Sequence, residues 1–278
     1  MWSGTAGWRL SVTEAVLLDL GHTVWDVKLS ADNWLAAWRS LHARLKGLVG
    51  DRVPPAEVLY REVWGRILGR RLAYFQARGY RELPPTALFA EAFGRLGLDL
   101  PWSFYRECLE AMARAELETT APAPGAGAVL AELRRRGLKT GLVSNTMYPA
   151  ELMEARLEEF GLKSLFDVLA FSSAVGWRKP HPAIFRFALG RLGVQPDRAV
   201  FVGDRVYEDV GGALRAGLWP VLTHQFRQEN PPPGVPVIRD LTELLELDAL
   251  LAGRPCAGGV AAGELGPDVG RPQPPGGH

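Results

Sequence analysis

The sequence predicts a doubly wound α/β fold with a mainly parallel sheet and an inserted all-helical domain. Three observations lead to this prediction. Short apolar runs alternate with amphipathic stretches after residue 121, one further apolar run lies near the amino end, and the segment between them has helical periodicity without a strand pattern. Such alternation favours parallel strands joined by right-handed helical crossovers, so we expect a Rossmann-like core.

Five apolar runs and four amphipathic stretches supply the elements of this core. The strands are expected at residues 15–20, 138–143, 167–171, 199–202 and 218–222. The helices after the insertion are expected at residues 127–136, 150–160, 182–192 and 209–216.

The inserted segment has its own pattern. Four amphipathic stretches predict helices, at residues 32–48, 55–78, 86–96 and 102–118, and we expect most of their tryptophans to pack between helices. Two prolines in residues 121–124 mark the return to the core, since each disfavours helix in the residue before it. We therefore assign residues 1–26 and 119–251 to the α/β core, residues 27–118 to the insertion, and the Gly- and Pro-rich residues 252–278 to a disordered tail.

Composition narrows the class of protein. The chain has 278 residues, 47% of them hydrophobic and 23% charged, as in ordinary globular proteins. A net charge of +1 gives no reason to expect a basic surface for nucleic acid. No apolar run approaches the roughly 20 residues of a membrane helix, and the first residues lack a targeting pattern, so we expect a cytoplasmic protein. Its two cysteines, Cys108 and Cys256, suggest neither a disulfide framework nor a metal site. The expected partner is a small molecule, and the oligomeric state is open.

Four polar residues stand at the ends of expected strands or in an adjoining loop. Asp19, Ser144 and Asp204 lie at the ends of three strands, and Lys179 lies in the loop that enters the helix at residue 182. Each alone has an ordinary structural explanation as a turn, cap or loop residue. Ligands of doubly wound sheets bind at the carboxyl ends of the strands, where the strand order reverses, so we expect these four residues to form one site. A dinucleotide site is excluded because no G-x-G-x-x-G follows the first strand.

The segments that contain these residues resemble the signatures of the haloacid dehalogenase-like hydrolase superfamily. They are Asp19-Leu20-Gly21-His22-Thr23, Leu142-Val143-Ser144-Asn145, Arg178-Lys179-Pro180, and Gly203-Asp204-x4-Asp209-x2-Gly212-Ala213-x2-Ala216-Gly217. The last is the most specific match. The resemblance covers residues 14–250, and the insertion stands where some family members have a helical cap, which closes over the site and selects the substrate.

The resemblance implies a Mg²⁺-dependent phosphatase that acts on a small phosphorylated metabolite. Asp19 would attack phosphorus and form an aspartyl-phosphate. Its carboxylate, that of Asp204 and the backbone carbonyl of Gly21 would bind the metal, and Asp209 would support these ligands.

The same resemblance implies which residues bind the phosphate group of the substrate. Ser144 and the backbone N–H groups of Asn145 and Thr146 would hold it near a helix start, and Lys179 would stabilise the charge on Asp19 and on the transferred group. Dehalogenation is disfavoured, because the related dehalogenases resemble metal-free sites and would not need the acids at 204 and 209.

One departure from the family pattern bears directly on whether the chain can catalyse phosphate hydrolysis. The usual first signature is Asp-x-Asp-Gly-Thr, and here Gly21 replaces the second Asp and His22 replaces the Gly. Loss of that acid/base group typically costs about 10² to 10⁴ in rate. Three interpretations remain open: a slow or leaving-group-selective enzyme, an enzyme in which His22 or Asp26 takes the acid/base role, and a phosphate-binding pseudoenzyme that acts through partner contacts.

Overall fold

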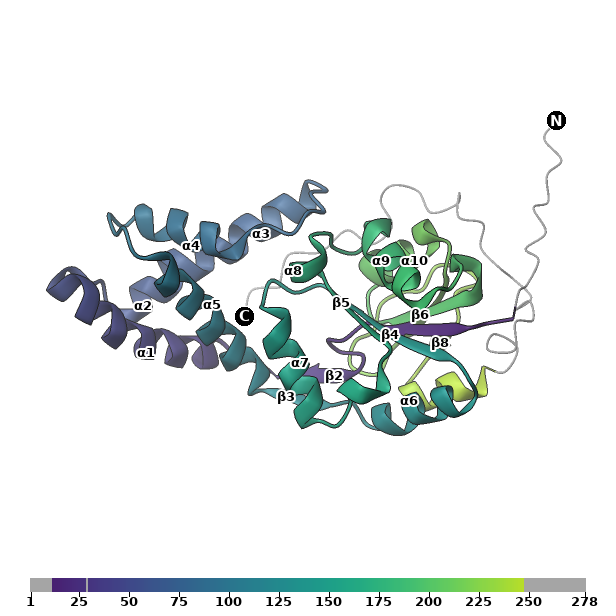
Figure 1. The fold of residues 1–278 in the computed structure, drawn as a ribbon. Coiled ribbons are helices and arrows are strands. Elements are labelled where there is room, and N and C mark those ends of the chain that lie inside the picture. Colours follow the sequence, from purple (N-terminus) through teal and green to yellow (C-terminus); the bar gives the residue numbers. More distant parts are fainter. Residues whose placement is uncertain (1–11, 29, 248–278) are drawn as a thin grey trace, which may run out of the picture.

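The computed structural model describes residues 12–28 and 30–247. A six-stranded parallel sheet forms the centre of its larger lobe, as Figure 1 shows. The strand order is β5-β4-β1-β6-β7-β8. The strands are β1 Ala15–Leu18, β4 Lys139–Ser144, β5 Val168–Phe171, β6 Ala199–Gly203, β7 Trp219–Thr223 and β8 Val237–Ile238. All five pairings are parallel, so the predicted fold class is confirmed. The edge strand β8 was not predicted, since two residues carry no recognisable pattern.

The strand order reverses at β1. From β1 the chain passes to β4 and β5 on one side, and then returns to β6 on the other side of β1. Ala15 pairs with Lys139 of β4 and with Ala199 of β6, so all three strands are in register. The carboxyl ends of β1, β4 and β6 therefore lie next to one another at the switch point of the sheet, which is where such folds bind ligands.

Side chains alternate between the two faces of the sheet, as strand geometry requires. Leu17 faces the helices α9 Pro182–Leu192 and α10 Gly211–Ala216, whereas Val16 and Leu18 face α6 Ala126–Arg135. Figure 1 shows these helices on opposite faces. Complete burial of one such side chain contributes roughly 1.5–3 kcal/mol, so both faces stabilise the position of the strand ends. Further elements of this lobe are α7 Ala150–Glu159 and the short helix α8 Ser172–Val175.

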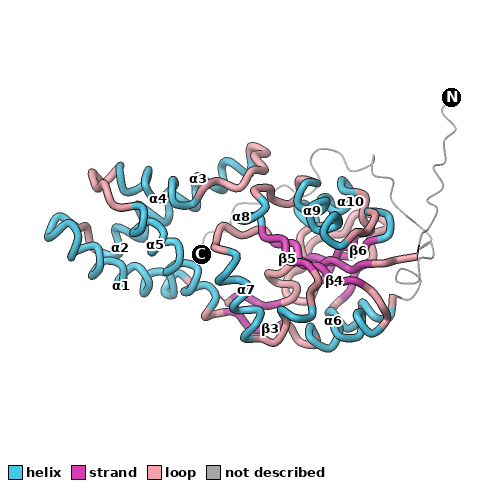
Figure 2. The backbone as a smooth tube through the Cα atoms, viewed as in Figure 1, coloured by secondary structure: helices cyan, strands magenta, loops and turns pink. Residues whose placement is uncertain are grey.

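The inserted segment forms a separate helical lobe, which we define as α1 to α5 (Figure 2). Its helices are α1 Ala31–Val49, α2 Ala56–Leu59, α3 Arg66–Gln76, α4 Pro85–Gly94 and α5 Trp102–Leu117, with the π-helical turn Tyr60–Gly65 between α2 and α3. Two short antiparallel strands connect the lobe to the core, β2 Trp25–Val27 and β3 Thr120–Pro122. This ribbon was not predicted, because strands of three residues are too short to show periodicity.

Aromatic rings fill the interior of the helical lobe. The Trp64 and Phe89 rings stack at 6.0 Å, and Trp38 lies 6.1 Å from Phe93. Trp38 and Trp64 are fully buried, as expected for most of the tryptophans in this segment, whereas Trp102 is 62% exposed. Such ring pairs add to the stability that burial alone provides.

One predicted helix begins at a different residue, and part of the predicted chain lies outside the described residues. The helix predicted at 209–216 starts earlier, because the π-helical turn Val206–Val210 precedes α10. Cys108 is buried, and the predicted disordered tail and Cys256 lie outside the described residues. Within residues 12–28 and 30–247, no helix is both long enough and apolar enough to cross a membrane.

Candidate active site

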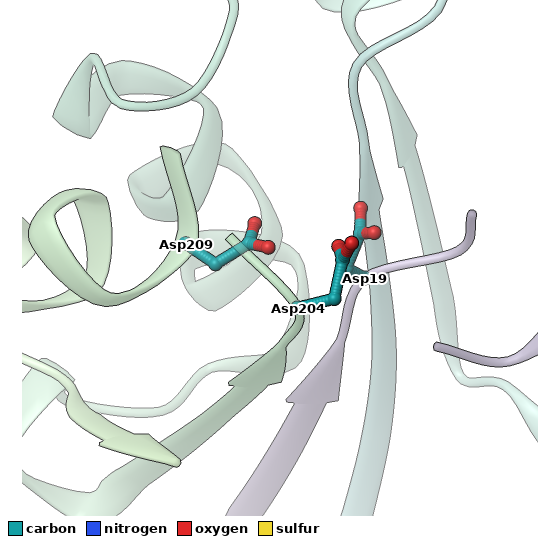
Figure 3. A group of neighbouring side chains, drawn as sticks. All are labelled: Asp19, Asp204 and Asp209. Carbon is teal, nitrogen blue, oxygen red and sulfur yellow. The ribbon is translucent and has the colours of Figure 1, made fainter. Parts of the chain in front are cut away.

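Three carboxylates meet at the switch point of the sheet. Asp19 follows β1, Asp204 follows β6, and Asp209 lies in the turn before α10; one oxygen from each lies within 4.8 Å of the others (Figure 3). The backbone N–H of Asp19 donates to the carbonyl of Val202 at 2.8 Å and so ties the end of β1 to β6. The predicted convergence of Asp19 and Asp204 is thus present in the structure, and Asp209 stands among them.

The glycine at the end of β6 makes this convergence possible. A Cβ atom built on Gly203 would collide with the carboxylate of Asp209. That carboxylate accepts a hydrogen bond from the backbone N–H of Arg205 at 2.9 Å, which fixes its position. A larger residue at 203 would therefore displace Asp209 from the cluster.

Lys179 joins two of the three acids. Its side chain is 2% exposed; Nζ donates to Oδ1 of Asp19 and lies 2.6 Å from Oδ1 of Asp209. Burial disfavours the charged ammonium, but Asp19 and Asp209 outweigh this effect and raise the pKa of Lys179 above its ordinary value. Lys179 thus lies beside Asp19, where a stabilising cation was expected, and its contact with Asp209 was not predicted.

The Asn145 side chain holds the Lys179 loop against the end of β4. Asn145 Oδ1 accepts from the backbone N–H of Lys179 at 2.8 Å, and Asn145 Nδ2 donates to the carbonyl of Lys179 at 3.0 Å. This reciprocal pair uses the side chain of Asn145. The backbone N–H of Asn145, to which the phosphate contact was assigned, takes no part in this pair.

Ser144 is the last residue of β4, is 5% exposed and lies in the wall of the site cavity. The segment after it differs from expectation. The backbone N–H of Thr146 donates to Oγ of Ser172 at 2.9 Å, and α7 begins only at Ala150. The structure therefore gives the Thr146 N–H a protein partner in place of the phosphate that was expected for it.

Burial and mutual repulsion oppose the full ionisation of Asp19 and Asp204 in the acid cluster. Burial raises the pKa of Asp204 to about 8, with Asp209 and Asp19 adding to the effect and Arg227 opposing it. Burial likewise raises the pKa of Asp19 to about 6, and the charge of Lys179 only partly opposes this. Arg227 Nε lies 2.9 Å from Oδ2 of Asp204, but neither this oxygen nor Oδ1 of Asp209 accepts a well-directed hydrogen bond. Buried carboxylate oxygens in this state fit a hard divalent cation such as Mg²⁺.

These pKa shifts predict how stability depends on pH. A carboxyl with a higher pKa in the folded chain favours folding while protonated, and for Asp204 this advantage is lost as pH rises from 3.8 to about 8. Without divalent cation we therefore expect the melting temperature of wild type to fall, relative to Asp204→Asn, across this range. Added Mg²⁺ should raise the melting temperature of wild type most at the upper end and should raise that of the variant much less. Calorimetry with and without Mg²⁺ measures both effects, and identical curves for the two proteins would contradict the metal assignment.

Gly21 and His22 differ in backbone conformation. The φ angle of Gly21 is not positive, and a Cβ atom built on Gly21 meets no other atom within 4 Å. His22 has φ of 57°, in the left-handed region that favours glycine. The chain thus has a side chain where the usual signature has Gly, and Gly at a position with room for a Cβ atom.

His22 forms a contact with Asp26. Nδ1 of His22 lies 3.2 Å from Oδ1 of Asp26, which is on β2. Burial lowers the pKa of His22, with Arg227 adding to the effect and Asp26 opposing it. A neutral His22 could accept a proton at neutral pH, but it would be a poor general acid.

A cavity of about 250 Å³ opens over the carboxylates and reaches the helical lobe. Gly21, His22, Asn145 and Lys179 line it together with Arg178, which stands in the third signature but was given no role. Three further charged residues of the lining were not selected from the sequence: Glu116, Arg205 and Glu208. Arg205 and Glu208 lie inside the last signature, so their position could have been noticed. Glu116 is at the end of α5 and shows no such signal, because only the fold brings it to the site.

A family model and a named relative both match most of this chain. The sequence model of the haloacid dehalogenase-like hydrolase family matches residues 13–217. The phosphoserine phosphatase of Thermus thermophilus is 33% identical over 258 residues, which is 87% of this chain and 94% of that protein.

Solved structures agree with this grouping. A HAD phosphatase from Thermococcus onnurineus superposes with a TM-score of 0.57 at 27% identity and covers 87% of this chain and 99% of that one. A 2-haloacid dehalogenase from Pseudomonas syringae pv. Tomato DC3000 gives a TM-score of 0.65 at 23% identity, covers 86% of this chain and 100% of that one, and supports the fold alone.

Proposed function

The chain belongs to the haloacid dehalogenase-like hydrolase family, and we propose that it is a Mg²⁺-dependent phosphohydrolase acting through an aspartyl-phosphate on Asp19. One observation carries this proposal. A buried lysine contacts Asp19, the acid that follows β1, and the buried carboxylates of Asp204 and Asp209 lie beside it at the switch point of the sheet. Phosphoryl transfer depends mainly on positioning and on electrostatic stabilisation, and both are provided there.

The metal would be held by Asp19, Asp204 and the backbone carbonyl of Gly21, with Asp209 in support. When bound, Mg²⁺ supplies positive charge that offsets repulsion between the carboxylates and an incoming phosphate. Because the contribution of residue 21 is its carbonyl, the substitution to Gly does not remove a ligand.

The residues of the chain account for both chemical steps. A carboxylate oxygen of Asp19 forms a bond to phosphorus while the bond to the leaving oxygen breaks. Ser144, the N–H of Asn145 and Lys179 hold the phosphoryl oxygens during this step. Water then attacks the phosphorus of the acyl phosphate, which releases phosphate and restores the Asp19 carboxylate.

Gly21 can neither protonate the leaving oxygen nor deprotonate the water. The leaving group must therefore depart as a stable anion or take its proton from solvent, so activated phosphates should react much faster than alkyl phosphates. His22, held by Asp26, is the candidate for a replacement base. The alternative function is a phosphate-binding pseudoenzyme, which the same site would also support.

The substrate belongs to the class of small phosphorylated metabolites. Both acidic and basic side chains line the cavity, among them Glu116 and Arg178, and they suit a substrate with charges of both signs. The helical lobe would act as a cap that excludes water. O-phosphoserine, named by the Thermus relative, is therefore a natural member of any substrate panel.

A substrate panel with and without Mg²⁺ tests this function. We expect turnover of acetyl phosphate and p-nitrophenyl phosphate that chelation abolishes and added Mg²⁺ restores, with slower turnover of O-phosphoserine and sugar phosphates. Binding of inorganic phosphate without turnover of any ester would favour the pseudoenzyme.

A further inference from the structure

Three consecutive residues of the helical lobe contact the core beside the loop that contains Lys179. They are Tyr80, Arg81 and Glu82, in the connection between α3 and α4, and we call residues 80–82 the clasp. The backbone N–H of Arg178 donates to the carbonyl of Tyr80 at 2.8 Å, and the N–H of Glu82 donates to the carbonyl of Gly176 at 3.0 Å. The clasp thus pairs with the segment that leads to Lys179.

Side chains extend this pairing. The Arg81 guanidinium lies 4.2 Å from the centre of the Trp177 ring, and the hydroxyls of Tyr80 and Tyr207 are 2.5 Å apart. Tyr207 stands in the turn between Asp204 and Asp209. The clasp therefore contacts two of the segments that build the site.

Glu82 makes the most extensive contact. Its side chain is only 5% exposed. Oε1 accepts from Arg71 of the helical lobe at 2.6 Å, and Oε2 accepts from Arg178 of the core at 3.0 Å and lies 2.7 Å from the Ser172 hydroxyl. One carboxylate thus connects the two lobes.

Ser172 carries this connection to the loop after Ser144. Its Oγ accepts the backbone N–H of Thr146 at 2.9 Å and lies 2.9 Å from the carbonyl of Thr146. Arg178 carries the connection to the neighbouring Lys179. Asn145 also binds the backbone of Lys179. Glu82, the loop after Ser144 and the loop that contains Lys179 therefore form one hydrogen-bonded network.

We propose that Glu82 is a positioning residue, which holds the loops of Ser144 and Lys179 in the arrangement that binds phosphate when the helical lobe is seated on the core. Glu82 is not among the residues that line the cavity, so it acts through Arg178 and Ser172. The inference rests on the proposed function, because it takes the same site as the phosphate site. It predicts that a substitution in the helical lobe alters phosphate affinity although it replaces no residue that lines the cavity.

A purely structural role for Glu82 is the competing explanation, because removing one member of a buried ion cluster destabilises a fold. Arg71→Met is the matched control. It removes the partner of Glu82 within the helical lobe and leaves the contacts of Glu82 with Arg178 and Ser172 in place. Both Arg71→Met and Glu82→Gln should lower the melting temperature, whereas only Glu82→Gln should disturb the phosphate loops.

Titration calorimetry with inorganic phosphate in the presence of Mg²⁺ tests the proposal on the full chain. We expect Glu82→Gln to weaken phosphate binding by about tenfold, by analogy with the lower end of the loss that follows removal of a partner that orients a metal-binding side chain. Arg71→Met should bind phosphate as wild type does. Wild-type affinity in folded Glu82→Gln, an equal loss in Arg71→Met, or no phosphate binding by folded wild type would overturn the proposal.

A second variant keeps the test decisive if Glu82→Gln does not fold. Ser172→Ala cuts the connection to Thr146 and leaves Glu82 paired with Arg71 and Arg178, so weakened phosphate binding supports the proposal and wild-type affinity overturns it. Turnover is measured separately. A wild type that binds phosphate but hydrolyses no ester would end the proposed function and leave this inference standing.

Discussion

Replacing Asp19 by Asn should abolish turnover of every phosphate ester, with a loss on the order of 10⁴-fold or more, the scale on which removal of a covalent nucleophile slows an enzyme. The amide is a poor nucleophile, and no neighbouring side chain is placed to substitute for it. Asp204 and Asp209 belong to the same cluster, but the proposed site assigns both to the metal and neither to the attack on phosphorus. Initial rates with acetyl phosphate at saturating Mg²⁺ measure the effect.

The fold should tolerate this substitution. Lys179 keeps Asp209 as its partner, and the change removes one of three mutually repelling carboxylates. Circular dichroism and calorimetry with inorganic phosphate serve as controls. A folded Asp19→Asn protein with a rate near that of wild type would reject the assignment of the nucleophile.

Restoring the signature with the double change Gly21→Asp and His22→Gly should speed hydrolysis of alkyl phosphates by up to about 10² to 10⁴, the contribution of positioned proton transfer. The structure favours this exchange at both positions. An added Cβ at Gly21 has free space, and the positive φ of residue 22 suits Gly better than His. The gain should be small for acetyl phosphate, whose leaving group needs no proton. Rates across esters of graded leaving-group pKa give the comparison.

The single variants separate the effects. His22→Gly adds no carboxylate, so it should not produce the gain; a large loss of alkyl phosphate turnover in this variant would instead favour His22 as the acid/base group. Gly21→Asp alone tests whether His22 crowds the new carboxylate. If a folded, Mg²⁺-binding double variant is no faster than wild type on any ester, loss of the acid/base group does not limit this protein.

The sequence predicts the parts of the site that depend on local pattern. Apolar runs place the strands, and parallel strands bring Asp19, Ser144 and Asp204 to one edge because their carboxyl ends must meet there. The fold class and the order of the core elements follow from the same pattern.

The rest depends on contacts between distant segments. Nothing near Lys179 in the sequence shows that its ammonium also contacts Asp209, and nothing near Thr146 shows that its N–H binds Ser172. The same holds for Glu82, which stands in an ordinary connection between two helices and meets the core only through the fold. The positive φ of His22 is a further case, since a sequence letter does not reveal a backbone angle.

Detection of the phosphorylated enzyme tests the central claim most directly. The second step also lacks an acid/base group at residue 21, so the aspartyl-phosphate should form from acetyl phosphate faster than water removes it. Mass spectrometry after rapid quenching should find one added phosphoryl group on the peptide that contains Asp19, and hydroxylamine should remove it. It should be absent in Asp19→Asn and less abundant in the Gly21→Asp, His22→Gly double variant. Turnover of acetyl phosphate with an unmodified Asp19 peptide, or with the phosphoryl group on another residue, would contradict the account.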